Sequence, residues 1–188
     1  LSLLDNLLNW AKSQTGELGF SPEKINLSKV ILHIIELKLS QAKAKNISLH
    51  FSATDEIEIS TDENILRTVL RNLISNAIKF TNPEGHINVV VNKNHDHVEI
   101  SIVDNGVGMD DTTIHKIFDL STSVTLPGTA NENGSGLGLV LCREFVELLD
   151  GHLWVESEVG KGSNFKFTLP FHIPEPELLN PVYSKVIV

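Results

Sequence analysis

Residues 86–104 have the pattern of two strands joined by a short polar turn, and this pattern restricts the fold more than any other segment. The stretches HINVVVNK (86–93) and HVEISIVD (97–104) alternate apolar and polar side chains, as strands with one buried face do. A second pair, HLWVESE (152–158) and SNFKFTLP (163–170), flanks the turn VGKG. Strands joined by short turns pair antiparallel, so the chain does not follow the alternating β-α order of a parallel sheet.

Helical periodicity marks four segments between and before these strands: 28–45, 60–81, 110–119 and 137–150. The first helix is predicted to begin at Ser28, and a capping box of Ser60 and Glu63 is predicted to start the second. Residues 47–53 alternate like one more strand. The sequence therefore predicts an α+β fold, a two-layer α/β sandwich in which helices cover one face of a mixed, mostly antiparallel sheet.

Composition and charge exclude several classes of function. The 188 residues carry a net charge of −9, which argues against a nucleic-acid binder because no basic excess exists to displace counterions from phosphates. The single cysteine, Cys142, excludes an internal disulfide, and on its predicted helix it is expected to be a core residue rather than a reactive one. No apolar run approaches the roughly 20 residues that span a bilayer. We expect a cytoplasmic location for this chain, within a longer protein that is membrane-anchored or soluble.

The stretch NLISNAIKFT (72–81) places Asn72, Asn76 and Lys79 along one narrow stripe of the second helix. Asn is a poor helix former, and a plain solvated face would more often carry Glu and Lys. Carboxamide oxygens suit Mg²⁺, and an ammonium suits phosphate. The stripe therefore indicates a binding function for this face of the helix.

Two glycine-rich stretches carry the remaining candidate residues. DNGVGM (104–109) follows a strand, so Gly106 and Gly108 are expected to take positive φ angles and approach a ligand closely, while Asp104 offers an acceptor to an amino group. GSGLGL (134–139) precedes a helix, whose N-terminus offers N–H groups to phosphate. A Rossmann fingerprint is excluded by the position of these glycines late in the chain, and no P-loop motif occurs.

In this order and spacing, the Asn stripe, DNGVGM, KIFD (116–119) and GSGLGL closely resemble the N, G1, F and G2 boxes of sensor histidine kinase ATP-binding domains. The resemblance covers about residues 20–170, and the fold is shared more distantly with DNA gyrase, heat-shock chaperones and mismatch-repair ATPases. It implies that ATP and Mg²⁺ are the cofactors. It also implies that residues 120–135 form an ATP lid.

The resemblance assigns an expected role to each matching residue. Asn76 is expected to ligate Mg²⁺, with Asn72 acting beside it through the metal's coordination shell or the phosphates. Lys79 is expected to contact phosphate, which makes Asn72 and Lys79 the candidate catalytic pair, and Asp104 is expected to accept a hydrogen bond from adenine N6. The other expected nucleotide-binding residues are Phe80, Gly106, Gly108, Met109, Gly134, Ser135, Gly136, Leu137, Gly138 and Leu139.

Position 72 and the histidines bear on the reaction. ATP-hydrolysing relatives carry a Glu general base four residues before the metal-binding Asn, whereas this chain has Asn72, which cannot accept a proton at neutral pH. Phosphoryl transfer to a histidine is therefore expected rather than efficient hydrolysis.

None of the eight histidines lies in the family's H-[ED]-x-x-x-P setting, so we expect the acceptor on a helix upstream of Leu1 and no autophosphorylation by this chain alone. Arg is missing after Phe118 and Asn133 replaces a common lid Lys, so Lys116 or a partner segment is expected to supply a cation.

The predicted organisation has three parts. Residues 1–18 are expected to be the end of a dimerisation helix and a linker, residues 19–171 the catalytic ATP-binding domain, and residues 172–188 a tail or linker. The expected partners are ATP, the upstream phosphoacceptor helix, a response regulator receiver domain and a second copy in a full-length homodimer. Two alternatives stay open: an anti-sigma-type Ser/Thr kinase relative, and a degenerate nucleotide-binding module that signals only through protein contacts.

Overall fold

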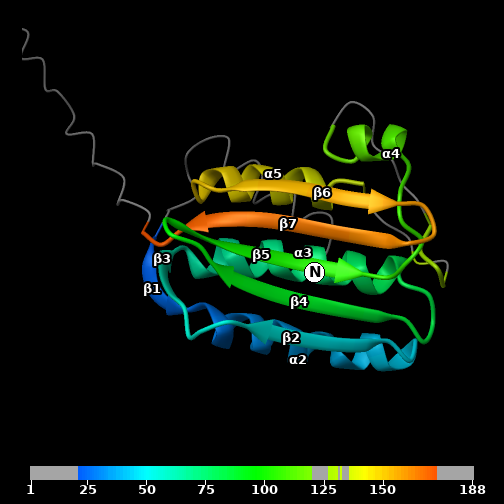
Figure 1. The fold of residues 1–188 in the computed structure, drawn as a ribbon, viewed down its shortest axis with the longest axis horizontal. Coiled ribbons are helices and arrows are strands. Elements are labelled where there is room, and N and C mark those ends of the chain that lie inside the picture. Colours follow the sequence, from blue (N-terminus) through cyan, green and yellow to red (C-terminus); the bar gives the residue numbers. More distant parts are fainter. Residues whose placement is uncertain (1–20, 120–126, 131, 133–135, 173–188) are drawn as a thin grey trace, which may run out of the picture.

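A sheet with helices packed against one face forms the architecture of the computed structural model, which describes residues 21–119, 127–130, 132 and 136–172. The elements of this part of the chain, in order, are β1 (Glu23–Asn26), α2 (Leu27–Ala44), β2 (Ser48–Ala53), β3 (Glu58–Thr61), α3 (Glu63–Phe80), β4 (His86–Lys93), β5 (His97–Asp104), α4 (Asp111–Lys116), α5 (Gly138–Leu148), β6 (His152–Glu158) and β7 (Gly162–Pro170). Figure 1 shows α2, α3 and α5 running behind the sheet strands.

The five-stranded sheet has the order β2-β4-β5-β7-β6, and the pair β2–β4 is its parallel connection. The other neighbouring strands are antiparallel. The two predicted hairpins are confirmed: β4 and β5 have the predicted bounds, and β7 begins one residue earlier than predicted, at Gly162. The mixed, mostly antiparallel sheet and the α+β class are therefore as predicted.

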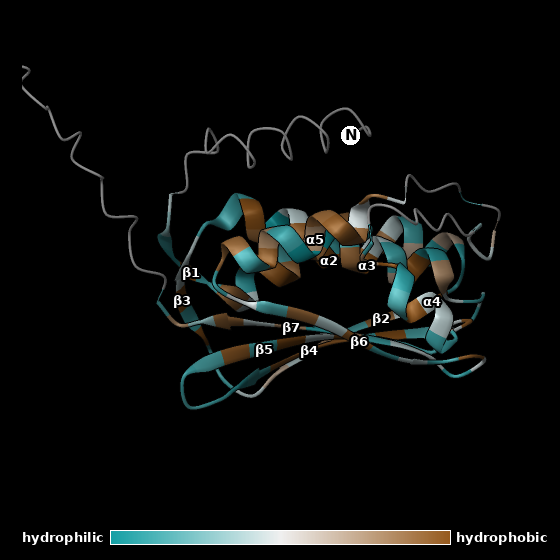
Figure 2. Ribbon diagram, turned by 90° about the horizontal axis from the view of Figure 1, so that it is seen from above, coloured by the Kyte–Doolittle hydropathy of each residue, from teal (hydrophilic) through white to brown (hydrophobic). Residues whose placement is uncertain are grey.

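The core lies between the helices and one face of the sheet. Leu66, Leu70 and Leu73 of α3 are fully buried, as their helical spacing requires for a helix that packs along its whole length. Ile87 and Val89 of β4 belong to the same core and are equally buried. Figure 2 shows this two-layer arrangement edge-on, with the helices above the sheet.

Both predicted helix starts are wrong by a few residues. The N-cap of α3 is Asp62, whose Oδ1 accepts hydrogen bonds from the N–H groups of Asn64 (3.0 Å) and Ile65 (3.1 Å). Ser60, the predicted cap, instead lies in β3 and pairs with Lys24 of β1. The N-cap of α2 is Asn26 rather than Ser28, and its side chain accepts from Lys29 N at 3.0 Å.

A two-stranded antiparallel sheet of β1 and β3 was not predicted. Its strands are four residues each and join segments 32 to 38 positions apart, from the pair Asn26 and Glu58 to the pair Glu23 and Thr61. Residues 1–18 and 173–188, predicted to be helix, linker and tail, lie outside the described residues, so the predicted division into three parts stays a prediction. None of the helices in the described part of the chain has the length and apolarity needed to cross a bilayer.

Candidate functional site

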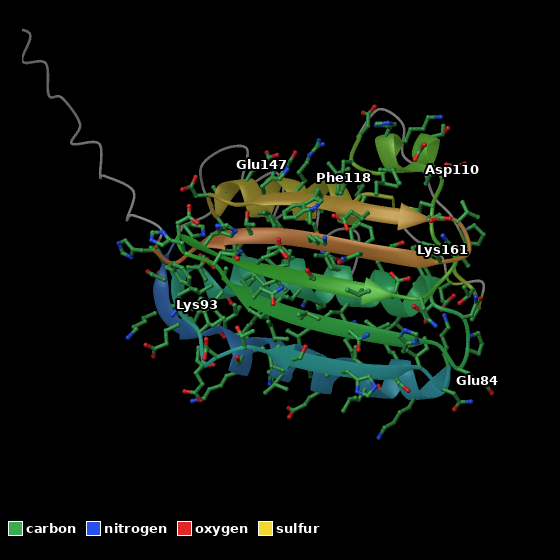
Figure 3. All side chains as sticks on the ribbon, in the orientation of Figure 1. Glu84, Lys93, Asp110, Phe118, Glu147 and Lys161 are labelled. Atoms are coloured by element: carbon green, nitrogen blue, oxygen red, sulfur yellow. The ribbon has the colours of Figure 1, made fainter. Side chains whose placement is uncertain are left out.

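The predicted site residues converge at one end of the sheet. The strand β5 ends there at Asp104, α3 ends there at Phe80, and α5 begins there at Gly138. Figure 3 places Glu84, Asp110 and Lys161 at this end and Lys93 at the opposite end. The topology therefore brings together motifs that are far apart in the sequence.

The polar stripe of α3 borders this end of the core. Asn72, Asn76 and Lys79 are half-buried, whereas their helical neighbours Leu73 and Ile74 are fully buried. The stripe thus lies along the border of the buried face of α3.

The carboxamide of Asn72 lies between α3 and α5. Its Oδ1 is 3.8 Å from the position that a Cβ on Gly138 would take. Its Nδ2 is a buried donor without a hydrogen-bond partner among the described residues. A buried unpaired donor is costly, so this amide can donate to a further bond partner that the described residues do not supply.

Cys142 packs beside Asn72 and is a core residue, as predicted. Burial raises the pKa of its thiol to about 12, and the Asn72 side chain beside it opposes part of this shift. A thiol with such a pKa is not a nucleophile at neutral pH.

Lys79 is half-buried and lies near the Phe80 ring and the Glu132 carboxylate. Burial lowers the pKa of its ammonium, and the Glu132 carboxylate acts in the opposite direction. Its Nζ lies 4.6 Å from the centroid of the Phe80 ring, within cation–π distance. The ammonium thus lies beside both an aromatic ring and a carboxylate.

Asp104 is a buried carboxylate at the end of β5 and is 6% exposed. Its Oδ1 accepts hydrogen bonds from Gly106 N (2.9 Å) and Ser163 N (3.3 Å). Burial raises the pKa of this carboxyl, and the two backbone donors offset part of that shift. The two donors therefore hold one oxygen of the carboxylate, Oδ1, in place.

The two glycines after Asp104 serve different purposes. Gly108 has the predicted positive φ, 65°, and a Cβ there would lie 1.9 Å from Glu158 O. For Gly106 the prediction of positive φ is wrong, because the structure has no left-handed backbone there. Its missing side chain is needed for a close approach, since a Cβ would lie 2.2 Å from Phe80 O. Met109, next along, donates its N–H to Ser157 Oγ at 2.9 Å, which ties this loop to the β6–β7 hairpin.

The second glycine-rich loop enters α5. Gly136 has a φ of 72°, and Leu137 is the N-cap, without a side-chain capping bond. Leu139 is half-buried and packs against the core. The N-terminus of α5 thus lacks a side-chain cap and faces Asn72, while Gly134 and Ser135 lie outside the described residues.

Sequence reasoning missed a cluster around Lys45. Its ammonium contacts Glu132 at 3.1 Å and Thr129 Oγ1 at 2.6 Å, beside Lys79. These residues are more than 80 positions apart from Lys45, and no local motif links them. Lys116, the cation expected from the sequence, is exposed at the end of α4.

Proteins of known families match both the sequence and the fold. The family described as histidine kinase-, DNA gyrase B- and HSP90-like ATPase matches residues 61–173. The adaptive-response sensory kinase SasA of Synechococcus sp. (strain JA-3-3Ab) is 33% identical over 175 residues, covering 91% of this chain and 45% of SasA. The sensor histidine kinase WalK of Bacillus subtilis (strain 168) is 29% identical over 174 residues, covering 91% of this chain and 28% of WalK.

Solved structures agree with this relationship. The nucleotide-free catalytic domain of histidine kinase ThkA has a TM-score of 0.71 at 25% identity, covering 81% of this chain and 97% of that chain. Full-length ShkA in complex with AMPPNP has a TM-score of 0.79 at 25% identity, covering 93% of this chain and 36% of that chain.

The chain spans less than half the length of the curated relatives SasA and WalK. The family match nevertheless covers more than half of this chain, and it includes the Asn stripe and both glycine-rich loops. This chain belongs to the histidine kinase-, DNA gyrase B- and HSP90-like ATPase family, as a catalytic ATP-binding domain of the sensor histidine kinase type.

Proposed function

We propose that this chain binds ATP with Mg²⁺ and presents the γ-phosphate to a histidine elsewhere in the full-length protein. The observation that carries the proposal is the orientation of Asp104, whose Oδ1 is bonded to two backbone N–H groups at the end of β5. Such a fixed carboxylate suits the N6 amino group of adenine. The full-length relative ShkA supports an adenine-nucleotide ligand, since its structure contains AMPPNP.

The phosphates and the metal would lie along the polar stripe of α3. The side chain of Asn76 would ligate Mg²⁺ through its oxygen. The Nδ2 of Asn72, which has no partner among the described residues, would donate to a phosphate oxygen or a metal-bound water. Lys79 would supply a point charge to the phosphates, assisted by the N–H groups at the start of α5. When bound, Mg²⁺ neutralises phosphate charge and orients the phosphates.

The same residues favour transfer over hydrolysis. Asn72 stands where a water-activating carboxylate would be needed, and an amide does not accept a proton at neutral pH. An incoming imidazole nitrogen needs no such base, because its own lone pair forms the bond to the γ-phosphorus while the bond to the ADP oxygen breaks. The product ADP takes the electron pair of the broken bond, and the imidazole proton is lost to solvent.

The acceptor and the partners follow from the longer relatives. We propose an acceptor histidine on an upstream dimerisation helix, a homodimer in the full-length protein, a cytoplasmic location, and a response regulator receiver domain as the next phosphate carrier. A structure of ThkA in complex with the response regulator TrrA supports the last point through a shared fold at 23% identity.

Calorimetric titration with ADP tests the metal site through Asn76→Ala. The wild type is expected to bind ADP more tightly with Mg²⁺ than without it, and Asn76→Ala is expected to lose that gain, about tenfold, with little change in metal-free binding. Asn64→Ala, at an exposed position of the same helix, is the matched control. A Mg²⁺ effect that persists in Asn76→Ala would place the metal elsewhere. Wild-type protein that binds no ADP would overturn the proposed function.

A further inference from the structure

Lys45 lies at the end of α2 and reaches across to the end of α3. Its Nζ donates to the carbonyl oxygens of Ile78 (2.8 Å) and Lys79 (3.1 Å). Its side chain is only 10% exposed, although it carries a charge. The last carbonyls of a helix carry a partial negative charge, so an ammonium there caps α3 at the point where its polar stripe ends.

The same ammonium holds a second segment of the chain in place. Thr129 Oγ1 lies 2.6 Å from Lys45 Nζ and donates to Thr81 O at 2.8 Å. Thr129 N donates to Lys79 O at 3.0 Å. Residues 127–130 and 132 are thereby fixed against the end of α3, beside Lys79.

Glu132 brings a negative charge into this arrangement. Its Oε1 is 3.1 Å from Lys45 Nζ, and its Oε2 accepts from Ala130 N at 2.8 Å. Gly128 lies between this carboxylate and Lys79: a Cβ on Gly128 would be 2.3 Å from Glu132 Oε2 and 2.6 Å from Lys79 Cγ. The carboxylate is therefore next to the lysine that the proposed function assigns to phosphate.

We propose that Lys45 is a positioning residue of the nucleotide site, which pairs with Glu132 so that this carboxylate does not oppose the phosphates at Lys79. The inference rests on the proposed function. Without Lys45, the bonds from Thr129 to Lys79 O and Thr81 O would still hold Glu132 near Lys79, where its carboxylate would compete with the nucleotide phosphates for that ammonium. A carboxylate near a phosphate repels it, so the effect must grow with the charge of the ligand.

The charge dependence gives a test that a merely structural role would fail. MgADP and uncharged adenosine are titrated calorimetrically into the 188-residue chain, its variants Lys45→Met and Glu132→Gln, and the double variant. Lys45→Met is expected to weaken the binding of MgADP about fivefold and the binding of adenosine less than about twofold. A fivefold change is the scale of one partly screened charge. Glu132→Gln is expected to tighten the binding of MgADP about threefold, and the affinity of the double variant for MgADP is expected to return to within about twofold of the wild type.

Lys24→Met is the matched control for loss of one lysine charge. Lys24 pairs with Glu58 at 2.7 Å, both side chains are exposed, and Figure 1 places β1 and β3 at the opposite end of the sheet from Asp104. Equal losses for MgADP and adenosine in Lys45→Met would overturn the inference, and so would wild-type affinity in both single variants. Wild-type protein that binds no MgADP would instead overturn the proposed function, and the inference with it.

Discussion

Replacing Asp104 by asparagine is expected to weaken ADP binding at least thirtyfold and to reduce the preference for ADP over GDP. An asparagine Oδ1 can still accept from Gly106 N and Ser163 N, as the carboxylate does. Its Nδ2 would then face the ligand and present a donor to adenine N6, which is itself a donor. Loss of a bond to a charged acceptor costs about 2 kcal/mol or more, which corresponds to the thirtyfold change. Guanine O6 is an acceptor, so GDP is expected to lose little affinity.

Titrations of ADP and GDP at pH 7 measure both effects. Asp110→Asn is the control, because Asp110 is exposed and its side-chain cap on Thr113 N is one that asparagine also makes. Unchanged ADP affinity in Asp104→Asn would remove this carboxylate from the adenine site. An equal loss for both nucleotides would point to general damage of the loop.

The stability of Asp104→Asn separates recognition from folding. Burial raises the pKa of Asp104 above its ordinary value of 3.8, so the fold favours the protonated form. The contribution of this group to stability is therefore fully present below the unfolded-state pKa, and it is lost as pH rises through the folded-state pKa. At pH 7, well above the unfolded-state pKa, this contribution is reduced, and asparagine places no charge in the buried site. Asp104→Asn is therefore expected to unfold at the same or a higher temperature than the wild type while binding ADP more weakly.

Gly106→Ala is expected to lower the free energy of unfolding by about 2–4 kcal/mol. The added Cβ would lie 2.2 Å from Phe80 O, a main-chain atom that cannot rotate away. The loop would have to withdraw from the end of α3, which breaks the hydrogen bond from Val107 N to Phe80 O, 3.1 Å long. Asp104 would move with the loop, so nucleotide binding is expected to fall as well.

Urea denaturation of Gly106→Ala and Gly138→Ala measures this steric effect. Gly138 is helical, and its added Cβ would meet only Asn72 Oδ1, at an ordinary 3.8 Å, so Gly138→Ala is expected to keep the stability of the wild type. Similar free energies of unfolding for Gly106→Ala and the wild type would contradict the close approach of loop and helix. A similar loss in both variants would contradict the steric explanation.

Elements with strong local patterns were predictable. The bounds of β4 and β5 follow from eight residues each of alternation around a short turn, where a shift by one residue would expose the buried side. The cap of α3 was misplaced because Ser60 and Asp62 are both good N-caps. Only the pairing of Ser60, in β3, with Lys24 of β1 decides between them.

The candidate site was predictable where short motifs carry it. Asp104 and Asn72 were predicted as candidates because each belongs to such a motif, and the structure places the ends of β5 and α3, which carry these motifs, at one end of the sheet. Lys45 was not found, because its partners lie 33 to 87 positions further along the chain. A lysine between a helix and a strand gives no local sign of burial, so the tertiary fold alone reveals its environment.

The order of strands has a consequence for synthesis on the ribosome. The last described strand, β7, lies inside the sheet, between β5 and β6. Until residues 162–170 leave the exit tunnel, β5 keeps one edge of unpaired backbone groups and β6 has no neighbour in the sheet. Open strand edges promote association between nascent chains. The vectorial emergence of this domain therefore ends with the insertion of an interior strand, and a nascent chain whose residues 162–170 are still inside the tunnel exposes these open edges.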